Sequence, residues 1–171
     1  MKVFGIGLSR TGTTSLNDTL KASGLNMIHY PKDTELFGGL YDGCTDIPVV
    51  YHMSSLAFIF RDSKFVQTLR DKEEWLDRIV PYFERKRSWG QSGTQVELRK
   101  KIYGSPFPNR QEASDAWDAH EARVRDQFSA MPDRLIKINI IAGDDPSKLY
   151  EFLGLKNPPN KFIHANKLND K

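Results

Sequence analysis

Hydroxyl side chains and one arginine are concentrated near the start of the chain, in a loop bounded by two glycines. This loop, at residues 7–14, follows an apolar stretch at residues 2–8 and leads into a helical pattern. Glycine lets the backbone turn tightly with its N–H groups inward, and a helix N-terminus adds unpaired donors and partial positive charge. The pattern therefore predicts a strand, an anion-binding loop and a helix. The candidate ligand contacts are Ser9, Arg10, Thr11, Gly12, Thr13, Thr14 and Ser15.

The loop differs from the nucleotide-triphosphatase pattern G-x-x-x-x-G-K-[ST] at one position. Thr13 stands where that pattern has the lysine that meets a γ-phosphate, and Arg10 supplies a positive charge inside the loop instead. This indicates a donor other than ATP or GTP. Two alternatives are a plain glycine-rich turn and a dinucleotide-binding loop, although Arg10 stands where G-x-G-x-x-G requires its third glycine.

The segment from Ser9 to Leu16, Ser-Arg-Thr-Gly-Thr-Thr-Ser-Leu, resembles the 5′-phosphosulfate loop of sulfotransferases. These enzymes use 3′-phosphoadenosine 5′-phosphosulfate (PAPS) and typically carry Pro-Lys-Ser-Gly-Thr-Thr there, so Arg10 falls on the lysine of that pattern. The resemblance implies that PAPS is the sulfuryl donor, that adenosine 3′,5′-bisphosphate is the product, and that no metal is required. It also implies that Arg10 stabilises charge on the leaving oxygen.

A second element is similar to the part of the family that holds the 3′-phosphate of PAPS. An apolar stretch at residues 64–69 ends in Arg70 and Asp71, and Trp75 follows, as in one bacterial branch of the family. The resemblance implies that Arg70 contacts the 3′-phosphate. Arg78 stands where the family pattern has serine, and since a guanidinium also binds phosphate, Arg78 is a further candidate.

An acceptor must lose its proton as it attacks sulfur, so a base is expected near it. Cytosolic sulfotransferases place a histidine in a Thr-His-Leu-Pro-like segment, and the similar segment here, at residues 45–48, is Thr-Asp-Ile-Pro. The resemblance therefore implies Asp46 as the first candidate. His29 is the other, because it ends a predicted strand and ligands collect at the carboxyl edge of parallel sheets.

Strand-like and helical patterns alternate along the chain. Strands are expected at residues 2–8, 25–30, 64–69 and 135–141. Helices are expected from residue 14 and at residues 53–60, 72–87, 95–103, 111–131 and 147–153. Residues 31–48 are expected to be irregular, with a short helix near residues 35–40. This alternation predicts a single α/β domain over residues 1–171, with three αβα layers and a mostly parallel sheet like that of P-loop NTPases.

Composition limits the class of partner. The formal net charge of +3 over 171 residues is mild, so neither a nucleic acid nor a membrane surface is expected as a partner. The single cysteine, Cys44, excludes an intrachain disulfide, and no apolar run approaches the roughly 20 residues of a membrane span. A cytoplasmic protein is expected.

The acceptor is expected to be a small molecule or a glycan, held by the loops at residues 31–45 and 88–108. Two alternative functions stay open at this point: a P-loop kinase or nucleotidase that uses ATP, and a non-catalytic module that binds a nucleotide. Nothing in the sequence indicates the oligomeric state.

Overall fold

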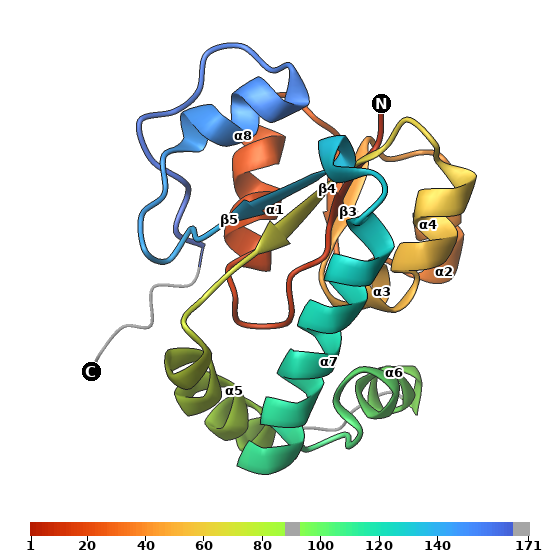
Figure 1. Cartoon of the computed structure of the whole chain (residues 1–171), viewed down its shortest axis with the longest axis vertical. Coiled ribbons are helices and arrows are strands. Elements are labelled where there is room, and N and C mark those ends of the chain that lie inside the picture. The colour runs from red at the N-terminus through yellow and green to blue at the C-terminus, as the bar shows by residue number, and fades with distance from the viewer. Residues whose placement is uncertain (88–92, 166–171) are drawn as a thin grey trace.

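The computed structural model describes residues 1–87 and 93–165, and contains one parallel sheet. Residues 88–92, part of the stretch expected to form the acceptor pocket, lie outside this range. The strands are β1 (Val3–Gly5), β2 (Met27–His29), β3 (Gly43–Thr45), β4 (Lys64–Thr68) and β5 (Leu135–Ile138). Their order is β2-β3-β1-β4-β5, and every pairing is parallel, which confirms the predicted α/β class (Figure 1).

Helices lie on both faces of this sheet (Figure 1). Those expected from apolar periodicity are present, with ends shifted by a few residues. The described helices are α1 (Thr13–Ala22), α2 (Asp33–Phe37), α3 (Ile47–Tyr51), α4 (Met53–Ile59), α5 (Lys72–Arg87), α6 (Gly93–Tyr103), α7 (Arg110–Phe128) and α8 (Pro146–Leu153), with a 3-10 turn at Pro132–Arg134. Within the described ranges, no helix is long and apolar enough to cross a membrane.

The short helix expected near residues 35–40 is present as α2, shifted by a few residues, but the expectation that the rest of residues 31–48 is irregular was wrong. This segment contains α2, the whole of β3 and the start of α3. The three residues of β3 are Gly-Cys-Thr, which show neither an apolar run nor alternation, so local pattern does not reveal them. The strand forms because β1 and β2 pair with it on either side, and it therefore lies between the first two strands of the chain.

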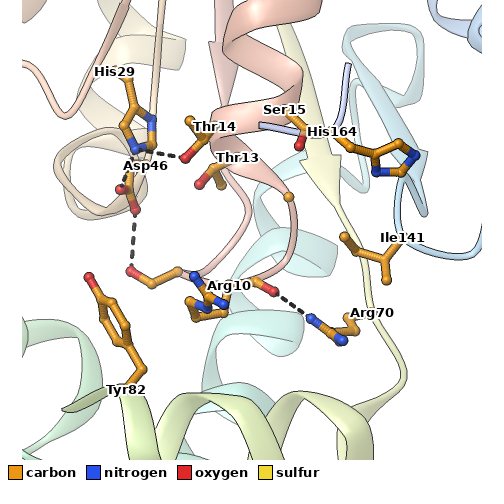
Figure 2. A pocket seen from close by; sticks show the side chains of 12 residues that line it. Arg10, Thr13, Thr14, Ser15, His29, Asp46, Arg70, Tyr82, Ile141 and His164 are labelled. Atoms are coloured by element: carbon orange, nitrogen blue, oxygen red, sulfur yellow. Dashed lines mark hydrogen bonds and ion pairs between the residues drawn. The ribbon is translucent and has the colours of Figure 1, made fainter. Parts of the chain in front are cut away.

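The chain leaves neighbouring strands toward opposite faces of the sheet. After β1, α1 packs Leu16 and Leu20 on one face, whereas after β3 and β4 the chain packs Val49 of α3 and Trp75 of α5 on the other. Such divergence leaves an open crevice at the carboxyl edge, where ligands bind in sheets of this kind. Figure 2 shows side chains from several strand ends meeting at this edge.

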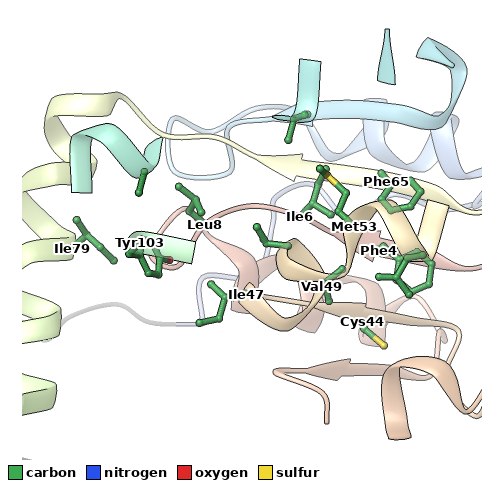
Figure 3. Close-up of a cluster of buried hydrophobic side chains, with 14 of the residues drawn as sticks. Phe4, Ile6, Leu8, Cys44, Ile47, Val49, Met53, Phe65, Ile79 and Tyr103 are labelled. Carbon is green, nitrogen blue, oxygen red and sulfur yellow. The ribbon is translucent and has the colours of Figure 1, made fainter. Parts of the chain in front are cut away.

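Two hydrophobic clusters, one on each face of the sheet, hold the layers together. Alternate residues of a strand point to opposite faces, so Phe4 joins the larger cluster and Val3 the smaller one. Figure 3 shows the larger cluster extending from Phe4 at the sheet to Ile79 on α5 and Tyr103 on α6. The predicted three-layer arrangement is therefore confirmed.

The loop between β1 and α1 lies directly against the end of β4. A Cβ atom on Gly7 would stand 1.8 Å from Thr68 Oγ1 and 2.6 Å from Thr11 Oγ1, so no side chain fits there. The two hydroxyls are 2.6 Å apart, and Thr11 Oγ1 also donates to the Leu8 carbonyl at 2.7 Å. Gly12, with φ 106°, adopts the left-handed backbone that starts α1.

His120 on α7 is a buried titratable residue away from this loop. Burial lowers the pKa of His120 to about 4, with smaller contributions from the positive charges of Arg123 and Lys137. His120 is therefore neutral in the folded protein near pH 7, and in the unfolded chain it would titrate at its ordinary pKa.

Replacing Gly7 by Ala should destabilise the protein, because the new methyl group collides with Thr68 Oγ1. We expect the free energy of unfolding to fall by about 2 kcal/mol, in the range typical of overpacked sites. Urea denaturation of the purified variant measures this. Gly93→Ala is the matched control, since a Cβ atom at Gly93 meets nothing within 4 Å. Equal stability of Gly7→Ala and Gly93→Ala would contradict the close packing at Gly7.

Lowering the pH should destabilise the fold through His120. Its folded pKa lies below its unfolded pKa, so its contribution is fully present above pH ~6.5 and is lost as pH falls toward about 4. The loss amounts to about 3 kcal/mol in the free energy of unfolding. Urea denaturation of wild type and His120→Gln at pH values between 7 and 4 measures this loss. We expect the difference in the free energy of unfolding between the two proteins to become smaller, or to change sign, as the pH falls. A constant difference would show that His120 does not titrate in this way.

Candidate active site

A cavity of about 340 Å³ opens at the carboxyl edge of the sheet, and the segments that follow all five strands contribute to it (Figure 2). The loop and helix start come after β1, His29 ends β2, Asp46 follows β3, Arg70 follows β4 and Ile141 comes after β5. The lining residues are Ser9, Arg10, Gly12, Thr13, Thr14, Ser15, His29, Asp46, Arg70, Tyr82, Ile141 and His164.

One wall of the cavity is the N-terminus of α1. The Gly12 carbonyl accepts the first helical bond, from Leu16 N–H at 2.9 Å. The N–H groups of the first helical turn therefore have no acceptor within the helix, and they open toward the cavity beside the hydroxyl-bearing residues 13–15. Backbone donors, hydroxyls and the positive end of the helix dipole together suit a phosphate or sulfate group.

Side chains from α5, α6 and the end of β4 fix the loop backbone in place. Trp75 Nε1 donates to the Ser9 carbonyl at 2.8 Å, and Ser9 N–H donates to Tyr103 Oη at 3.1 Å. Arg70 Nη1 donates to the Arg10 carbonyl at 3.3 Å. Trp75 and Tyr103 are fully buried, so these bonds hold the loop rigidly from below. The site is thus largely formed before a ligand binds.

Arginine side chains converge on this cavity. The pKa of Arg10 is lowered, chiefly by burial and further by the positive charges of Arg70, Arg85 and Arg78, while Tyr82 opposes the shift. Arg10 Nε is buried without a hydrogen-bond partner, and its guanidinium lies 5.5 Å from the centre of the Tyr82 ring. Arg70 forms an ion pair with the exposed Glu74 at 3.6 Å. A bound anion would offset the repulsion and supply the missing acceptor for Arg10.

Asp46 and His29 form a pair beside the start of α1, across the cavity from Arg70 (Figure 2). Asp46 Oδ2 lies 3.2 Å from His29 Nε2, and Asp46 Oδ1 accepts from Ser9 Oγ at 3.3 Å and from Ile47 N–H at 2.8 Å. His29 is held by Thr45 Oγ1, 2.9 Å from Nδ1, and by Thr14 Oγ1, 3.2 Å from Nε2. The pair therefore links β2 and β3 to the loop.

The backbone of Asp46 is strained. Its φ of 87° and ψ of −176° lie in a region that is essentially restricted to glycine. Such a conformation costs of order 1–3 kcal/mol, and it persists only where surrounding contacts enforce it. Here the strain places the carboxylate between His29 and Ser9 at the cavity wall, an arrangement typical of a residue with a chemical role.

Most of the residues predicted from the sequence line one cavity: Ser9, Arg10, Gly12, Thr13, Thr14, Ser15, His29, Asp46 and Arg70. Thr11 and Arg78 do not line it. Thr11 is buried beneath the loop, and its N–H and hydroxyl are both used in bonds to Leu8. Arg78 lies on α5, from where its charge reaches Arg10.

Three lining residues were not identified from the sequence: Tyr82, Ile141 and His164. Tyr82 lies four residues after Arg78, on the same face of α5, so helical spacing from Arg78 could have found it. His164 reaches the cavity because the C-terminal segment docks along α1. Ile163 N–H donates to Thr19 Oγ1 at 3.0 Å and Ala165 N–H to Ser15 Oγ at 3.3 Å, contacts that local pattern does not reveal.

Metal ligands do not gather in the described part of the chain. Across residues 1–87 and 93–165, no three His, Cys, Asp or Glu side chains are grouped so that they could hold a metal ion.

Comparison with known proteins agrees with this architecture. The chain is 24% identical to "Ava biosynthesis cluster protein M" from Aspergillus versicolor over 213 aligned residues, which cover 96% of this chain and 80% of that protein. A family model described as a sulfotransferase domain matches residues 31–170, which include Asp46 and Arg70. Because this match covers most of the chain, the protein belongs to the sulfotransferase-domain family.

Proposed function

We propose that this protein is a PAPS-dependent sulfotransferase that transfers a sulfuryl group to a hydroxyl or amine of a small acceptor and releases adenosine 3′,5′-bisphosphate. The observation that carries the proposal is one cavity lined by the N-terminus of α1, by Arg10 and Arg70, and by the Asp46–His29 pair. Anion-binding groups and a candidate base thus meet where a sulfuryl transfer would need both.

The residues at the loop fit the phosphosulfate end of the donor. The first N–H groups of α1 and the hydroxyls of residues 13–15 would hold the phosphosulfate, and Arg10 would face the bridging oxygen that leaves. The buried, unpartnered Nε of Arg10 supports an anion at this position. Arg70 would bind the 3′-phosphate, with Arg78 adding positive charge from α5.

The chemistry asks for alignment and charge stabilisation, as in phosphoryl transfer. As the acceptor oxygen forms its bond to sulfur, the bond from sulfur to the bridging oxygen breaks and that oxygen takes the electron pair. Asp46 would accept the acceptor's proton, and His29 would orient the carboxylate through Nε2. His29 is the alternative base, since its Nε2 lies at the same wall of the cavity.

Two further observations bear on the substrates. Thr13 replaces the lysine expected for a γ-phosphate, which favours PAPS over ATP as the donor. The relative from Aspergillus versicolor is named for a biosynthesis cluster, and this supports a small molecule as the acceptor.

Titration calorimetry with adenosine 3′,5′-bisphosphate, 5′-AMP and ATP tests the donor site. We expect wild type to bind the bisphosphate at least tenfold more tightly than AMP, because AMP lacks the 3′-phosphate that Arg70 would contact. Arg70→Ala should weaken bisphosphate binding by about tenfold to a hundredfold, which corresponds to the free energy of a hydrogen bond to a charged group. It should leave AMP binding nearly unchanged. Arg125→Ala, at an exposed position on α7, is the matched control.

The pattern of losses separates the possibilities. Equal loss of AMP and bisphosphate binding would assign Arg70 to the loop structure, through its bond to the Arg10 carbonyl. Tighter binding of ATP than of bisphosphate would overturn the proposed donor and favour a kinase or nucleotidase.

Replacing each member of the Asp46–His29 pair identifies the base. Asp46→Asn keeps an oxygen that can accept from Ile47 N–H but removes the proton acceptor, so we expect kcat to fall by about a hundredfold or more. Bisphosphate affinity should not change. The measurement is transfer of radiolabelled sulfate from PAPS to 4-phenylphenol, a neutral aromatic alcohol, with His29→Gln alongside. A larger loss of kcat in His29→Gln than in Asp46→Asn would make His29 the base.

A further inference from the structure

A second and larger cavity lies beside the first. It is a groove of about 640 Å³ lined by the start of α2 and by α3 on one side and by α6 on the other. Helices α3 and α6 pack against each other. The aromatic and apolar lining includes Tyr30, Pro31, Pro48, Tyr51 and Leu98. Both the size and this lining suit a small organic molecule.

The groove and the first cavity are joined by two short stretches of chain. His29 and Asp46 line the first cavity, while Tyr30 and Pro48, one and two residues further along, line the groove. Transfer in line requires the acceptor to approach sulfur from the side opposite the leaving oxygen, so an acceptor in the groove would have to extend past Asp46 and His29 toward the phosphosulfate loop.

Tyr30 connects the two cavities. It lines the groove, yet its hydroxyl is buried and has no hydrogen-bond partner. Burial raises the pKa of Tyr30 to about 12, and the negative charge of Asp46 contributes to the shift, so the hydroxyl lies within the field of the candidate base. The backbone of Tyr30, with φ 58°, is left-handed, which is unusual for a bulky residue. A buried hydroxyl without a partner is costly, and a ligand group that reaches it from the groove would satisfy it.

The charged and titratable side chains around the groove are of mixed sign, and several of them contact a neighbouring side chain. His52 Nε2 lies 3.3 Å from Asp33 Oδ1, and Lys101 Nζ donates to Tyr51 Oη at 3.1 Å. Glu97, a fourth charged or titratable lining residue, pairs with Lys100 at 2.8 Å. Lys32 is exposed at the start of α2. The groove thus presents aromatic and aliphatic surface rather than a concentrated charge.

We propose that this groove binds the acceptor, and that the acceptor is a neutral small molecule with a flat aromatic body and a hydroxyl group. This inference rests on the proposed function, because it places the acceptor opposite the donor. The aromatic body lies between Tyr51 and Leu98, and the reacting hydroxyl lies against Asp46, hydrogen-bonded to Tyr30 Oη. A strongly charged glycan does not match this lining.

Binding of 4-phenylphenol, measured by calorimetry on the full chain, tests the groove without requiring turnover. We expect saturable binding that is not competed by adenosine 3′,5′-bisphosphate, and at least tenfold weaker binding of the charged analogue 4′-hydroxybiphenyl-4-carboxylate. Thr94→Trp, which fills the groove from an exposed position on α6, should weaken 4-phenylphenol binding at least tenfold. Arg125→Trp, at an exposed position on α7 outside the groove, is the matched control and should not change it.

Tyr30→Phe tests whether the Tyr30 hydroxyl binds the acceptor or only supports the fold. It should weaken 4-phenylphenol binding about three- to tenfold, as expected for one hydrogen bond, and leave bisphosphate affinity and the unfolding midpoint unchanged. An equal loss of bisphosphate affinity would overturn the role of Tyr30 in acceptor binding.

Three outcomes would overturn the groove as the acceptor site: no binding of 4-phenylphenol, binding that Thr94→Trp leaves intact, or tighter binding of the carboxylate analogue. Bisphosphate titration of the same samples keeps the two proposals apart. If the protein binds the bisphosphate but not 4-phenylphenol, the proposed acceptor site is overturned and the proposed donor site is not. If it binds 4-phenylphenol but not the bisphosphate, the proposed donor site is overturned, and the acceptor role of the groove with it.

Discussion

The close approach of the first loop to the end of β4 is the constraint on which the rest of the structure depends. Gly7 has no side chain, so the hydroxyls of Thr11 and Thr68 meet in the space that a Cβ atom would fill. This contact ties the loop to the strand that continues into Arg70 and Trp75, and both of these side chains then bond back to the loop backbone. One missing side chain thus brings the two halves of the candidate site together.

The arrangement is costly in the absence of a ligand. Arg10 is partly buried among the charges of other arginines, with an unpartnered nitrogen, and Asp46 is held in a strained backbone conformation. Both features lower stability by themselves. The hydrophobic clusters on the two faces of the sheet compensate for this cost, and buried Trp75 and Tyr103 connect the larger cluster directly to the loop. The core therefore supports a site whose charges are arranged for an anion.

The two cavities differ in chemistry. Backbone donors, hydroxyls and arginines line the first, whereas tyrosine, proline and leucine side chains line the groove together with charged residues of both signs. This contrast follows from the topology. The anion-binding features arise where α1 begins beside β1, whereas the aromatic and apolar lining arises where α3 and α6 pack together.

The sequence by itself determined the elements whose signals are local. Glycines and hydroxyls at residues 7–14 predicted the anion-binding loop, and apolar periodicity predicted most helices. The resemblance of residues 64–75 to a sulfotransferase element implied Arg70, which lines the cavity. Tertiary structure alone decided the existence of β3, whose three residues form a strand only because β1 and β2 flank them. Tertiary structure also decided that the Thr11 side chain is buried beneath the loop and does not line the cavity, and that Tyr82 and His164 do line it. Local patterns report on backbone preference and on apolar faces, whereas these placements depend on contacts between residues far apart in the chain.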